Sequence, residues 1–473
     1  MGLKEIQKIT QIKFENTSFI NKARKYNETA KRLIDILPTL LYNDTWKMFL
    51  LYDDDAGYYK TYDDDKMAST LFHVLDSWTS FDVDICSSFL IELTKTLIKA
   101  LPKHRHISEH EVEHNQIAFK NIMLNTSTME TQAHTPKVLC YMYIDHKYIE
   151  DRKAWVTKAP VFLKYLASTF VTPDDGKADI SLIKLVQELM GGLFYAHKSA
   201  NMSIYCLGDG DNGKSVFSEA ILEQIFPEEF VSAASLELLT IDKFGCAELF
   251  KKRINITSED ESDKVKSGKF KNIVTGETMS AQEKYGKVFK FRNYAKLFFT
   301  SNISPQFLSF PKPMRKRIRV IPFNADFSIG SKNRIAGLEE MLKKEIPYII
   351  SFFLEGLERL RDNKFEFTEN AQVSALLNGL RDNSNGVSYF VANFCDITKE
   401  CLCSASDLYG SYKDAIDSLG FGKTSIQKFG RQLLEYDGVK KNQSNKSFYN
   451  LKLKEEVVEA ELNTEKEADK LFN

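Results

Sequence analysis

The segment that most constrains the fold is the glycine-rich run GDGDNGKS at residues 208–215. It follows a short apolar stretch, MSIYCL at 202–207, whose composition predicts a buried β-strand. It precedes SVFSEAILEQIF at 215–226, in which apolar residues recur at helical spacing until Pro227 ends the pattern. Strand, glycine-rich loop and helix in this order are the context in which a phosphate-binding loop occurs. The sequence therefore predicts an α/β domain that binds a nucleoside triphosphate.

The positions of this loop have distinct expected roles. Backbone N–H groups of residues 210–213, together with the positive end of the following helix, are expected to cradle the phosphates. Lys214 supplies a positive charge to the terminal phosphates, and the hydroxyl of Ser215 is expected to bind Mg²⁺. The alternative is a glycine turn without a ligand. The residues expected to contact ATP and its metal ion are Gly208, Gly210, Asp211, Asn212, Gly213, Lys214, Ser215 and Val216.

Two further strands predict the remaining polar groups of a catalytic site. An apolar run at 254–257 leads into Glu259 and Asp260. Carboxylates at a strand end can hold Mg²⁺ through water and orient the attacking water, with Glu259 as the second metal ligand. The alternative is an acidic loop. A second buried strand, in AKLFFTSNISP at 295–305, is expected to end at Asn302, whose side chain could touch the γ-phosphate or the attacking water.

The stretch SAQEKYGKVFKF at 280–291 predicts a β-hairpin with Lys284, Tyr285 and Lys287 near its tip. A cation, an aromatic ring and a second cation are side chains with which a loop can hold single-stranded nucleic acid, by charge and by stacking. The alternative is a solvated turn.

A basic run, PMRKRIRVIPF at 313–323, places Arg315, Lys316, Arg317 and Arg319 before and within an apolar strand. An arginine that reaches the nucleotide of a neighbouring subunit could come from this run, because such a group stabilises charge during phosphoryl transfer. The alternative is a basic surface patch, and the residues alone leave Arg315, Lys316 and Arg317 open as the finger.

The stretch HEVEH at 110–114 matches the HExxH pattern of zinc proteases. That site requires two imidazoles on one helical face, a buried glutamate and a third ligand. Because Glu113 lies inside the motif and the flanking residues are polar, the interpretation we favour is a solvated surface helix without metal.

Composition excludes several classes of protein. The chain has 473 residues, 43% of them hydrophobic and 27% charged, with a formal net charge of −1, so nucleic-acid binding would depend on local patches. None of the seven cysteines forms a CxxC pair, which favours reduced thiols in an intracellular compartment. The amino terminus lacks the apolar core of a signal peptide, and no run is long enough to span a membrane. We therefore expect a soluble intracellular protein that does not engage a membrane.

The order of the motifs resembles that of superfamily-3 helicases of the phage and plasmid primase–helicase type. Besides the glycine-rich loop, the resemblance rests on SED at 258–260, TGET…KY at 275–285, FFTSN at 298–302 and RKR…VIPF at 315–323. Upstream segments are similar to the accessory domain of that family and of poxvirus primase–helicases. Downstream, SASDLYGSYKDAIDSLGF and TSIQKFGRQLLEY resemble its winged-helix module.

The resemblance implies a fold and a division of the chain. The fold class is α/β, with a P-loop AAA+-like ATPase core flanked by an α+β N-terminal accessory domain and a C-terminal winged-helix domain. The expected parts are a helical segment at 1–44, the accessory domain at 45–195, the ATPase/helicase domain at 196–330, a helical linker with the winged helix at 331–452, and a charged tail at 453–473.

The resemblance also implies residue roles. Lys214 and Ser215 bind phosphate and Mg²⁺, Glu259 and Asp260 form the acidic pair, Asn302 senses the γ-phosphate, and Arg317 is the finger. Lys284 and Tyr285 lie on a channel hairpin, with Lys287 beside them. The chain departs from the family at Gly276-Glu277-Thr278, where Gly-Gly-Asp is usual, and at RKR, where an aromatic residue and two arginines are usual. The winged helix is locally basic through Lys423, Lys428, Arg431, Lys440, Lys441 and Lys446.

The implied activity is that of an ATP-driven, ring-forming DNA helicase that replicates a phage, plasmid, genomic island or virus. Its partners would be single-stranded and forked DNA, five further copies of the chain, and a primase or replication initiator. The location would be the cytoplasm of a bacterial host, or a viral replication site. Alternatives are a nucleotide-regulated initiator that binds or melts an origin without unwinding processively, and a protein-remodelling or packaging ATPase. A retained primase activity is a further alternative, because FDVDIC at 81–86 imitates a metal-binding DxD.

Overall fold

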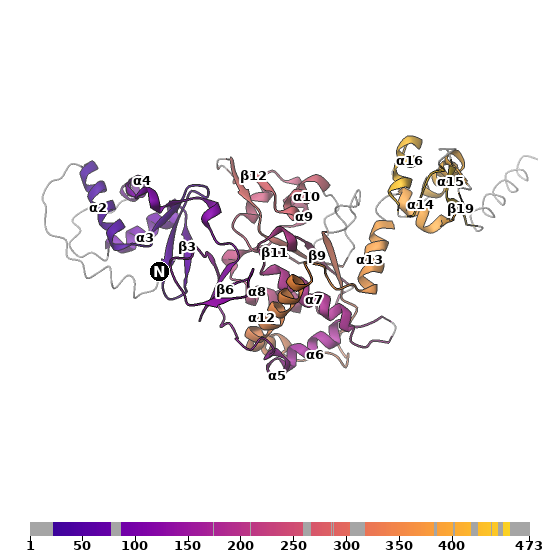
Figure 1. Ribbon diagram of the computed structural model, residues 1–473, viewed down its shortest axis with the longest axis horizontal. Coiled ribbons are helices and arrows are strands. Elements are labelled where there is room, and N and C mark those ends of the chain that lie inside the picture. Colours follow the sequence, from indigo (N-terminus) through magenta and orange to yellow (C-terminus); the bar gives the residue numbers. More distant parts are fainter. Residues whose placement is uncertain are drawn as a thin grey trace, which may run out of the picture.

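The computed structural model describes residues 22–76, 87–173, 175–208, 210–258, 266–284, 286, 288–302, 317–382, 386–400, 403–417, 424–436, 438–442 and 448–454. Figure 1 shows the N-terminal helices at one end of the molecule, a sheet with its helices in the middle, and a small helical unit at the other end. The predicted mixed α/β class, with parallel strands, is confirmed.

A four-stranded sheet with the order β3-β2-β1-β4 begins the described chain. Its aromatic and aliphatic strand residues pack against three helices, with Leu33, Leu71 and Leu93 in the shared core. The elements are α2 (Lys22–Ile36), β1 (Leu41–Asn43), β2 (Met48–Asp53), β3 (Tyr58–Tyr62), α3 (Asp64–Asp76), α4 (Ser87–Ala100) and β4 (His106–Ile107).

The first part was expected to be helical as far as residue 44, and this is wrong for its last residues. Leu41–Asn43 forms β1, which pairs with β2 and runs parallel to β4. Leu40 and Tyr42 are buried. Pairing with β2 and β4, rather than the local helical pattern, therefore decides the conformation of this segment.

A second sheet with the order β7-β6-β5-β8 follows. Its central strand β5 is fully buried, which explains its continuous apolar and amide composition. The strands are β5 (Gln116–Phe119), β6 (Met123–Asn125), β7 (Thr131–Gln132) and β8 (Met142–Ile144).

The central sheet has five strands in the order β10-β11-β14-β9-β15, and all of its pairs are parallel. The strands read as short apolar runs because both faces are covered. The chain leaves β9 for the far edge, returns through β11 and β14, and then crosses to the other side of β9. The strands are β9 (Ser203–Leu207), β10 (Val231–Ser232), β11 (Ile254–Thr257), β14 (Lys296–Ser301) and β15 (Ile318–Pro322).

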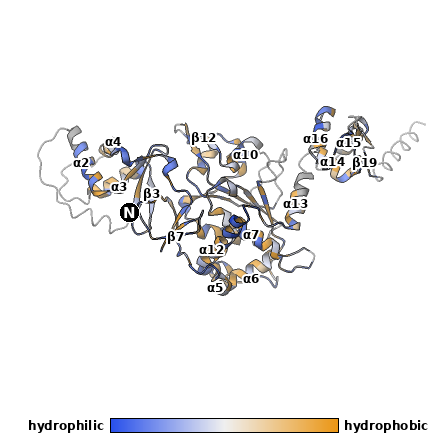
Figure 2. Cartoon of the chain, viewed as in Figure 1, coloured by the Kyte–Doolittle hydropathy of each residue, from blue (hydrophilic) through white to orange (hydrophobic). Residues whose placement is uncertain are grey.

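Helices α7 (Ile180–Leu193) and α12 (Leu338–Asp362) pack against each other through two glycines. A Cβ at Gly191 would lie 2.4 Å from the amide nitrogen of Leu357, and a Cβ at Gly356 would lie 2.1 Å from the carbonyl oxygen of Gln187. The glycines therefore allow the two backbones to approach closely. Figure 2 shows hydrophobic residues along these helices and the nearby α6 (Pro160–Thr169).

Shorter helices surround the sheet. They are α5 (Trp155–Lys158), the π-helix η4 (Val216–Leu222), α8 (Glu223–Ile225), α9 (Leu236–Ile241) and α10 (Ser267–Thr275). Within the described ranges, no helix combines the length and hydrophobicity needed to cross a lipid bilayer.

The C-terminal unit follows α13 (Ala371–Asp382), as the yellow end of the ribbon in Figure 1 shows. Its core contains Phe390, Leu408, Phe429 and Leu433. Helices α14 (Gly386–Phe394), α15 (Ala405–Asp417) and α16 (Ile426–Glu435) pack with two short antiparallel pairs. One pair is β16 (Cys395–Ile397) with β19 (Leu451–Leu453), and the other is β17 (Cys403–Ser404) with β18 (Phe448–Tyr449).

Candidate nucleotide site

A cavity of about 960 Å³ lies at the carboxyl ends of the central strands, and we call it the carboxyl-edge cavity. Four segments line it: the glycine-rich loop after β9, the end of β14, Phe327 with residues 334–340 around the start of α12, and Tyr165 on α6. In open parallel sheets, ligands bind outside the carboxyl ends where the strand order changes direction. Strand β9 lies at that point, between β14 and β15.

The loop backbone adopts conformations that glycine accommodates. Gly213 has φ 92°, and Asp211 has φ 47° without being glycine. A Cβ at Gly208 would lie 2.3 Å from both the Asn212 side-chain nitrogen and the carbonyl oxygen of Phe323. The loop is therefore closely packed against Phe323, which directly follows β15, the strand beside β9.

Lys214 lies inside this loop, with only 7% of its surface exposed. Its ammonium group donates hydrogen bonds to the carbonyl oxygen of Gly208 and, at 3.1 Å, to the side-chain oxygen of Asn212. Asn212 in turn donates to the carbonyl oxygen of Phe323 across 3.2 Å. The lysine is thus held against the loop by carbonyl-type oxygens, in reach of the cavity that it lines.

Two residues distant in sequence fix the other side of the loop. Tyr165 on α6 donates a 2.9 Å hydrogen bond from its hydroxyl to the carbonyl oxygen of Gly213, and burial raises its pKa. The Phe327 amide donates to the carbonyl oxygen of Asp211 at 2.7 Å. A Cβ at Gly213 would lie 3.2 Å from the Phe327 ring. Only glycine fits between these two rings without displacing one of them.

The helix after the loop begins with a π-helical turn, Val216–Leu222. The Ser218 hydroxyl donates to the carbonyl oxygens of Lys214 and Ser215, at 3.2 Å each. The helical pattern predicted for 215–226 is therefore present, although its first part is wider than an α-helix. Such π-helical turns are frequent at functional sites.

The structure brings Asn302 to the same cavity. Ser301 pairs with Leu207 in adjacent parallel strands, so the residue after β14 lies beside the start of the glycine-rich loop. Asn302 is exposed and lines the cavity with Thr300 and Ser301. Strand β11 ends at the same edge, because Thr257 pairs with Phe299. Glu259 and Asp260, which follow β11, lie outside the described residues.

Arg317 lies at the opposite edge of the sheet. It precedes β15, and its carbonyl oxygen accepts a 2.8 Å hydrogen bond from the amide of Ser203, the first residue of β9. The length of a five-residue strand separates this edge from the loop by about 15 Å. Arg317 and Lys214 of one chain are therefore not brought together. Arg315 and Lys316 lie outside the described residues, and Arg319 packs on the Phe367 ring at 4.6 Å.

The predicted hairpin is present as β12 (Thr278–Gln282) paired with β13 (Val288–Arg292). Lys284 is exposed near its tip. Met279 and Phe291 turn inward and are buried, whereas Lys290 and Arg292 are exposed. Tyr285 and Lys287 at the tip lie outside the described residues.

On α16, Lys428 and Arg431 are exposed, and Phe429 and Leu433 of the same helix are buried. The helix therefore presents both cations to solvent. Of the other expected basic residues, Lys440 and Lys441 are described, and Lys423 and Lys446 lie outside the described residues, as does FDVDIC at 81–86.

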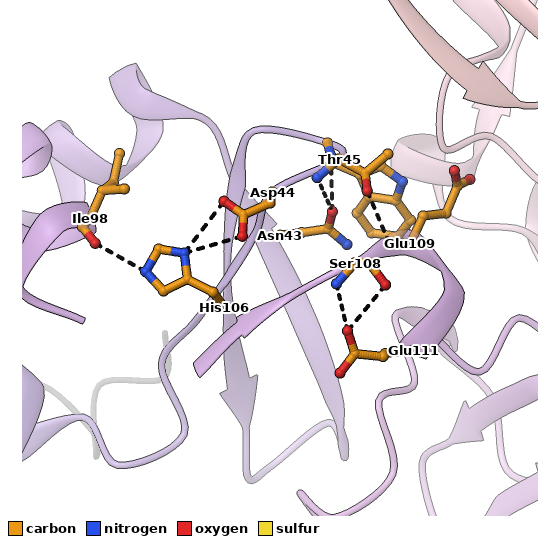
Figure 3. A network of polar contacts seen from close by, with 9 residues as sticks. Asn43, Asp44, Thr45, Ile98, His106, Ser108, Glu109 and Glu111 are labelled. Carbon is orange, nitrogen blue, oxygen red and sulfur yellow. Dashed lines mark hydrogen bonds and ion pairs between the residues drawn. The ribbon is translucent and has the colours of Figure 1, made fainter. Parts of the chain in front are cut away.

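The HEVEH segment does not form the surface helix that the sequence suggested. Glu109–Glu111 is a single 3-10 turn and Val112 is extended. Glu111 accepts hydrogen bonds from the Ser108 amide and hydroxyl at 2.7 and 3.1 Å, which closes the turn (Figure 3). Within the described ranges, no group of three or more His, Cys, Asp or Glu residues is placed to hold a metal ion.

The residue His106, just before this turn, belongs to a local network in Figure 3. Its ring lies between Asp44 and the carbonyl oxygen of Ile98, at 3.3 and 3.2 Å respectively. The network joins β4 to the end of α4 and to the turn after β1. The ring of His106 therefore has a structural role in this network.

Several cavity residues were not predicted from the sequence. Thr300 and Ser301 lie at the end of β14; the others come from α6, from the segment before α12 and from the first turn of α12, so no local motif links those others to the glycine-rich loop. Glycines at 330 and 337, both with positive φ, are the one local signal that the second segment is a loop. The unpredicted lining residues with polar or aromatic side chains are Tyr165, Thr300, Ser301, Phe327, Arg334, Glu339 and Glu340.

The donor set of the cavity fits a nucleoside triphosphate. The loop offers backbone N–H groups at the start of a helix, with a buried ammonium beside them. Ser215 lines the cavity and could provide a hydroxyl ligand to Mg²⁺.

Comparisons with known proteins give a partial match. A model of a family of unknown function (DUF5906) matches residues 206–315, which include the glycine-rich loop, β11, the hairpin and β14. No curated protein matches the chain. The chain is similar to the A form of the apo C-terminal region of NrS-1, with a TM-score of 0.45 and 13% identity, covering 87% of each chain. A second apo structure of that region has a TM-score of 0.44 and 12% identity, covering 88% of this chain and 98% of that one. These similarities are too weak to transfer an activity.

Proposed function

We propose that the protein is an ATP-dependent DNA helicase with a P-loop ATPase core, acting in the replication of a mobile element or virus. The observation that carries the proposal is the carboxyl-edge cavity, where buried Lys214 and the glycine-rich loop face Asn302 across neighbouring parallel strands. A nucleotide bound in this cavity would have its phosphate oxygens next to the backbone N–H groups of the loop and the ammonium group of Lys214.

The residues of the cavity divide the chemical work. Lys214 leaves its carbonyl partners to contact the terminal phosphates, and Asn302 orients the attacking water or contacts the γ-phosphate. Glu259 and Asp260, expected at the end of β11, position that water. Ser215 and Glu259 would hold Mg²⁺, which would neutralise part of the phosphate charge.

The position of Arg317 supports a composite site made by two copies of the chain. At about 15 Å from the loop along the strand, it cannot reach a nucleotide held by Lys214 of its own chain. A neighbouring copy that presents its carboxyl-edge cavity to Arg317 would complete the site in a ring. A ring of six is the arrangement that the family resemblance implies.

The nucleic acid would be held at two places. The hairpin with Lys284, Tyr285 and Lys287 is proposed to contact a single strand in the ring, where charge and stacking act together. The unit formed by α14–α16 and its short strands is proposed to be a winged helix that docks duplex DNA through Lys428 and Arg431 on α16.

A second candidate function is a nucleotide-regulated initiator that binds or melts an origin without processive unwinding. The exposed cations of α16 and the cavity would serve it equally well. Strand displacement on a forked duplex with ATP separates the two. We expect displacement by the native chain and loss in a Glu259→Gln variant that still binds nucleotide. ATP-dependent binding or melting without displacement would favour the initiator, and displacement that is equal in both proteins would remove the assigned role of Glu259.

A further inference from the structure

A second, smaller pocket of about 230 Å³ lies at the opposite edge of the central sheet, and we call it the amino-edge pocket. Asn201 comes just before β9, and Asn293 and Tyr294 come between β13 and β14, so these residues gather where the parallel strands begin. The pocket also receives His114 and Arg292. It therefore joins the foot of the hairpin to the N-terminal part of the chain.

Two cations are buried immediately behind this pocket. Arg253 is fully buried and precedes β11, and Lys296 is 2% exposed and begins β14. The two are adjacent in the sheet, because the Lys296 amide donates to the carbonyl oxygen of Arg253 at 3.0 Å. Buried charges of one sign are costly unless an opposite charge compensates them.

The hydrogen bonds of these cations leave the charge uncompensated. Arg253 donates one bond, to the carbonyl oxygen of His114 at 2.7 Å, and its Nε and Nη1 atoms are buried without a partner. Lys296 donates to the side-chain oxygen of Asn201 at 2.6 Å. Over the part of the chain that the structure describes, neither cation forms an ion pair with a carboxylate.

The pocket itself is built from hydrogen-bond donors and stacked rings. The rings of His114 and Tyr294 are stacked with centroids 3.8 Å apart, and the Arg292 guanidinium lies 5.9 Å from the centre of the Tyr294 ring. Both ring nitrogens of His114 are buried without a partner. Glu113 is the one acidic residue among those that line the pocket, and it is exposed.

Gly276 keeps one wall of the pocket open. Its φ is 64°, and a Cβ there would lie 2.9 Å from the side-chain nitrogen of Asn201 and from the carbonyl oxygen of Asn293. The side-chain nitrogen of Asn201 thus faces the wall at Gly276, while its oxygen holds Lys296. The Lys296 ammonium polarises the Asn201 amide through this hydrogen bond, which makes the side-chain N–H groups of Asn201 stronger donors toward the pocket.

We propose that the amino-edge pocket binds a phosphoryl group, held by the Asn201 amide and Arg292 and attracted by the buried charges of Arg253 and Lys296. The group could be carried by free phosphate or by the backbone of a single strand reaching the foot of the hairpin. The proposal is independent of the ATPase assignment, because this site lies at the other edge of the sheet from Lys214.

The test uses the full chain in a Lys214→Ala background, which weakens phosphate binding at the glycine-rich loop. Thermal unfolding is measured in sodium phosphate against sodium chloride at equal ionic strength. We expect phosphate to raise the melting temperature in this background. If Lys214→Ala removes the stabilisation by phosphate, that stabilisation belongs to the glycine-rich loop and the proposal is overturned. The proposal is also overturned if neither phosphate nor single-stranded DNA raises the melting temperature.

Two substitutions make the test specific. Asn201→Asp places a carboxylate beside Lys296, so it should raise the melting temperature without phosphate and abolish the phosphate effect. Arg292→Gln should weaken binding about tenfold, the loss expected for one charge-assisted hydrogen bond. The control Lys271→Gln removes an exposed cation of α10 and should change nothing. An unchanged phosphate effect in Asn201→Asp and Arg292→Gln would overturn the proposal.

Anisotropy with a fluorescent oligothymidylate distinguishes the two sources of the group. Weaker oligonucleotide binding in Arg292→Gln, with Lys271→Gln unchanged, would assign the pocket to the nucleic-acid backbone. Equal oligonucleotide binding in both, together with a lost phosphate effect, would assign it to free phosphate.

Discussion

The hydroxyl of Tyr165 donates a 2.9 Å hydrogen bond to the carbonyl oxygen of Gly213, a residue 48 positions further along the chain. Through this bond, a helix outside the parallel sheet fixes one peptide group of the glycine-rich loop. The loop therefore has its shape before any ligand arrives, which reduces the ordering cost of binding.

Removal of this hydroxyl should weaken nucleotide binding without abolishing it. Tyr165→Phe removes one of the two donors to the Gly213 carbonyl oxygen and leaves the Phe217 amide at 3.0 Å, so we expect a loss of about 1 kcal/mol in nucleotide affinity. A fluorescent ATP analogue measures the affinity. Tyr195→Phe is the matched control, because Tyr195 stacks on Phe365 and has no role at the cavity. Equal affinities in the two variants would contradict the role of Tyr165.

Gly213→Ala should destabilise the fold more than Gly176→Ala, a replacement at another glycine with positive φ. Gly213 and Gly176 both have positive φ, but a Cβ at Gly176 would meet nothing within 4 Å. Gly176→Ala therefore isolates the backbone cost, about 1 kcal/mol. Gly213→Ala adds the contact with the Phe327 and Tyr165 rings, and urea unfolding should show a larger loss for it. The opposite order would contradict the packing described for the loop.

Mixed assemblies test whether Arg317 acts on a neighbouring chain. Lys214→Ala alone and Arg317→Ala alone should each lose ATPase activity. When the two inactive proteins are mixed and allowed to exchange subunits, some interfaces regain both groups, so activity should partly return. Lys214→Ala mixed with itself at the same concentration is the control. Failure of the mixture to recover any activity would argue against a site shared between chains.

The two exposed cations of α16 should contribute to duplex binding through charge. If Lys428 and Arg431 each neutralise one phosphate, the double change to Ala should lower the slope of log affinity against log salt by about 2. Anisotropy titrations at several salt concentrations give the slope. Lys343→Ala, on the exposed side of α12, is a control that should leave it unchanged. An unchanged slope in the double variant would remove α16 from the interface.

The burial of Lys296 predicts a specific dependence of stability on pH. Burial lowers the pKa of this lysine from its usual value of 10.5 to about 7. Between about pH 7 and pH 10.5 this lysine is neutral in the folded chain and charged in the unfolded chain, so the free energy of unfolding rises with pH. Below about pH 7 the lysine is charged in both states, and its burial destabilises the fold in full. Lys296→Met should therefore stabilise the fold near pH 7, on the order of 2–4 kcal/mol.

The gain should shrink as the pH rises from about 7 and vanish above 10.5, because only there is the lysine neutral in the unfolded chain as well as in the folded one. Urea unfolding at several pH values, with the exposed Lys290→Met as control, measures the difference. A gain that is the same at all pH values would show that the charge of Lys296 is not the cause.

Local patterns predicted the elements that carry the loop. The apolar runs at 202–207, 254–257 and 295–301 became β9, β11 and β14, because short β-prone runs bounded by polar residues have few other stable conformations. The hairpin predicted within 280–291 is also present, as β12 and β13. The glycine-rich run also predicted the loop after β9, where Gly210 and Gly213 adopt the positive φ angles that glycine accommodates without steric cost.

Long-range pairing decided what the sequence left open. The parallel pairing of β15 with β9 places Arg317, which precedes β15, and Lys214, which follows β9, at opposite ends of neighbouring strands, and no local pattern specifies that pairing. Tyr165, Phe327 and Arg334 reach the cavity from segments far from the loop in the chain. The residues Leu41–Asn43 form a strand because β2 and the distant β4 pair with them on either side. The same dependence on distant partners assembled Arg253 and Lys296 behind the amino-edge pocket, since only the parallel pairing of β11 with β14 makes them neighbours.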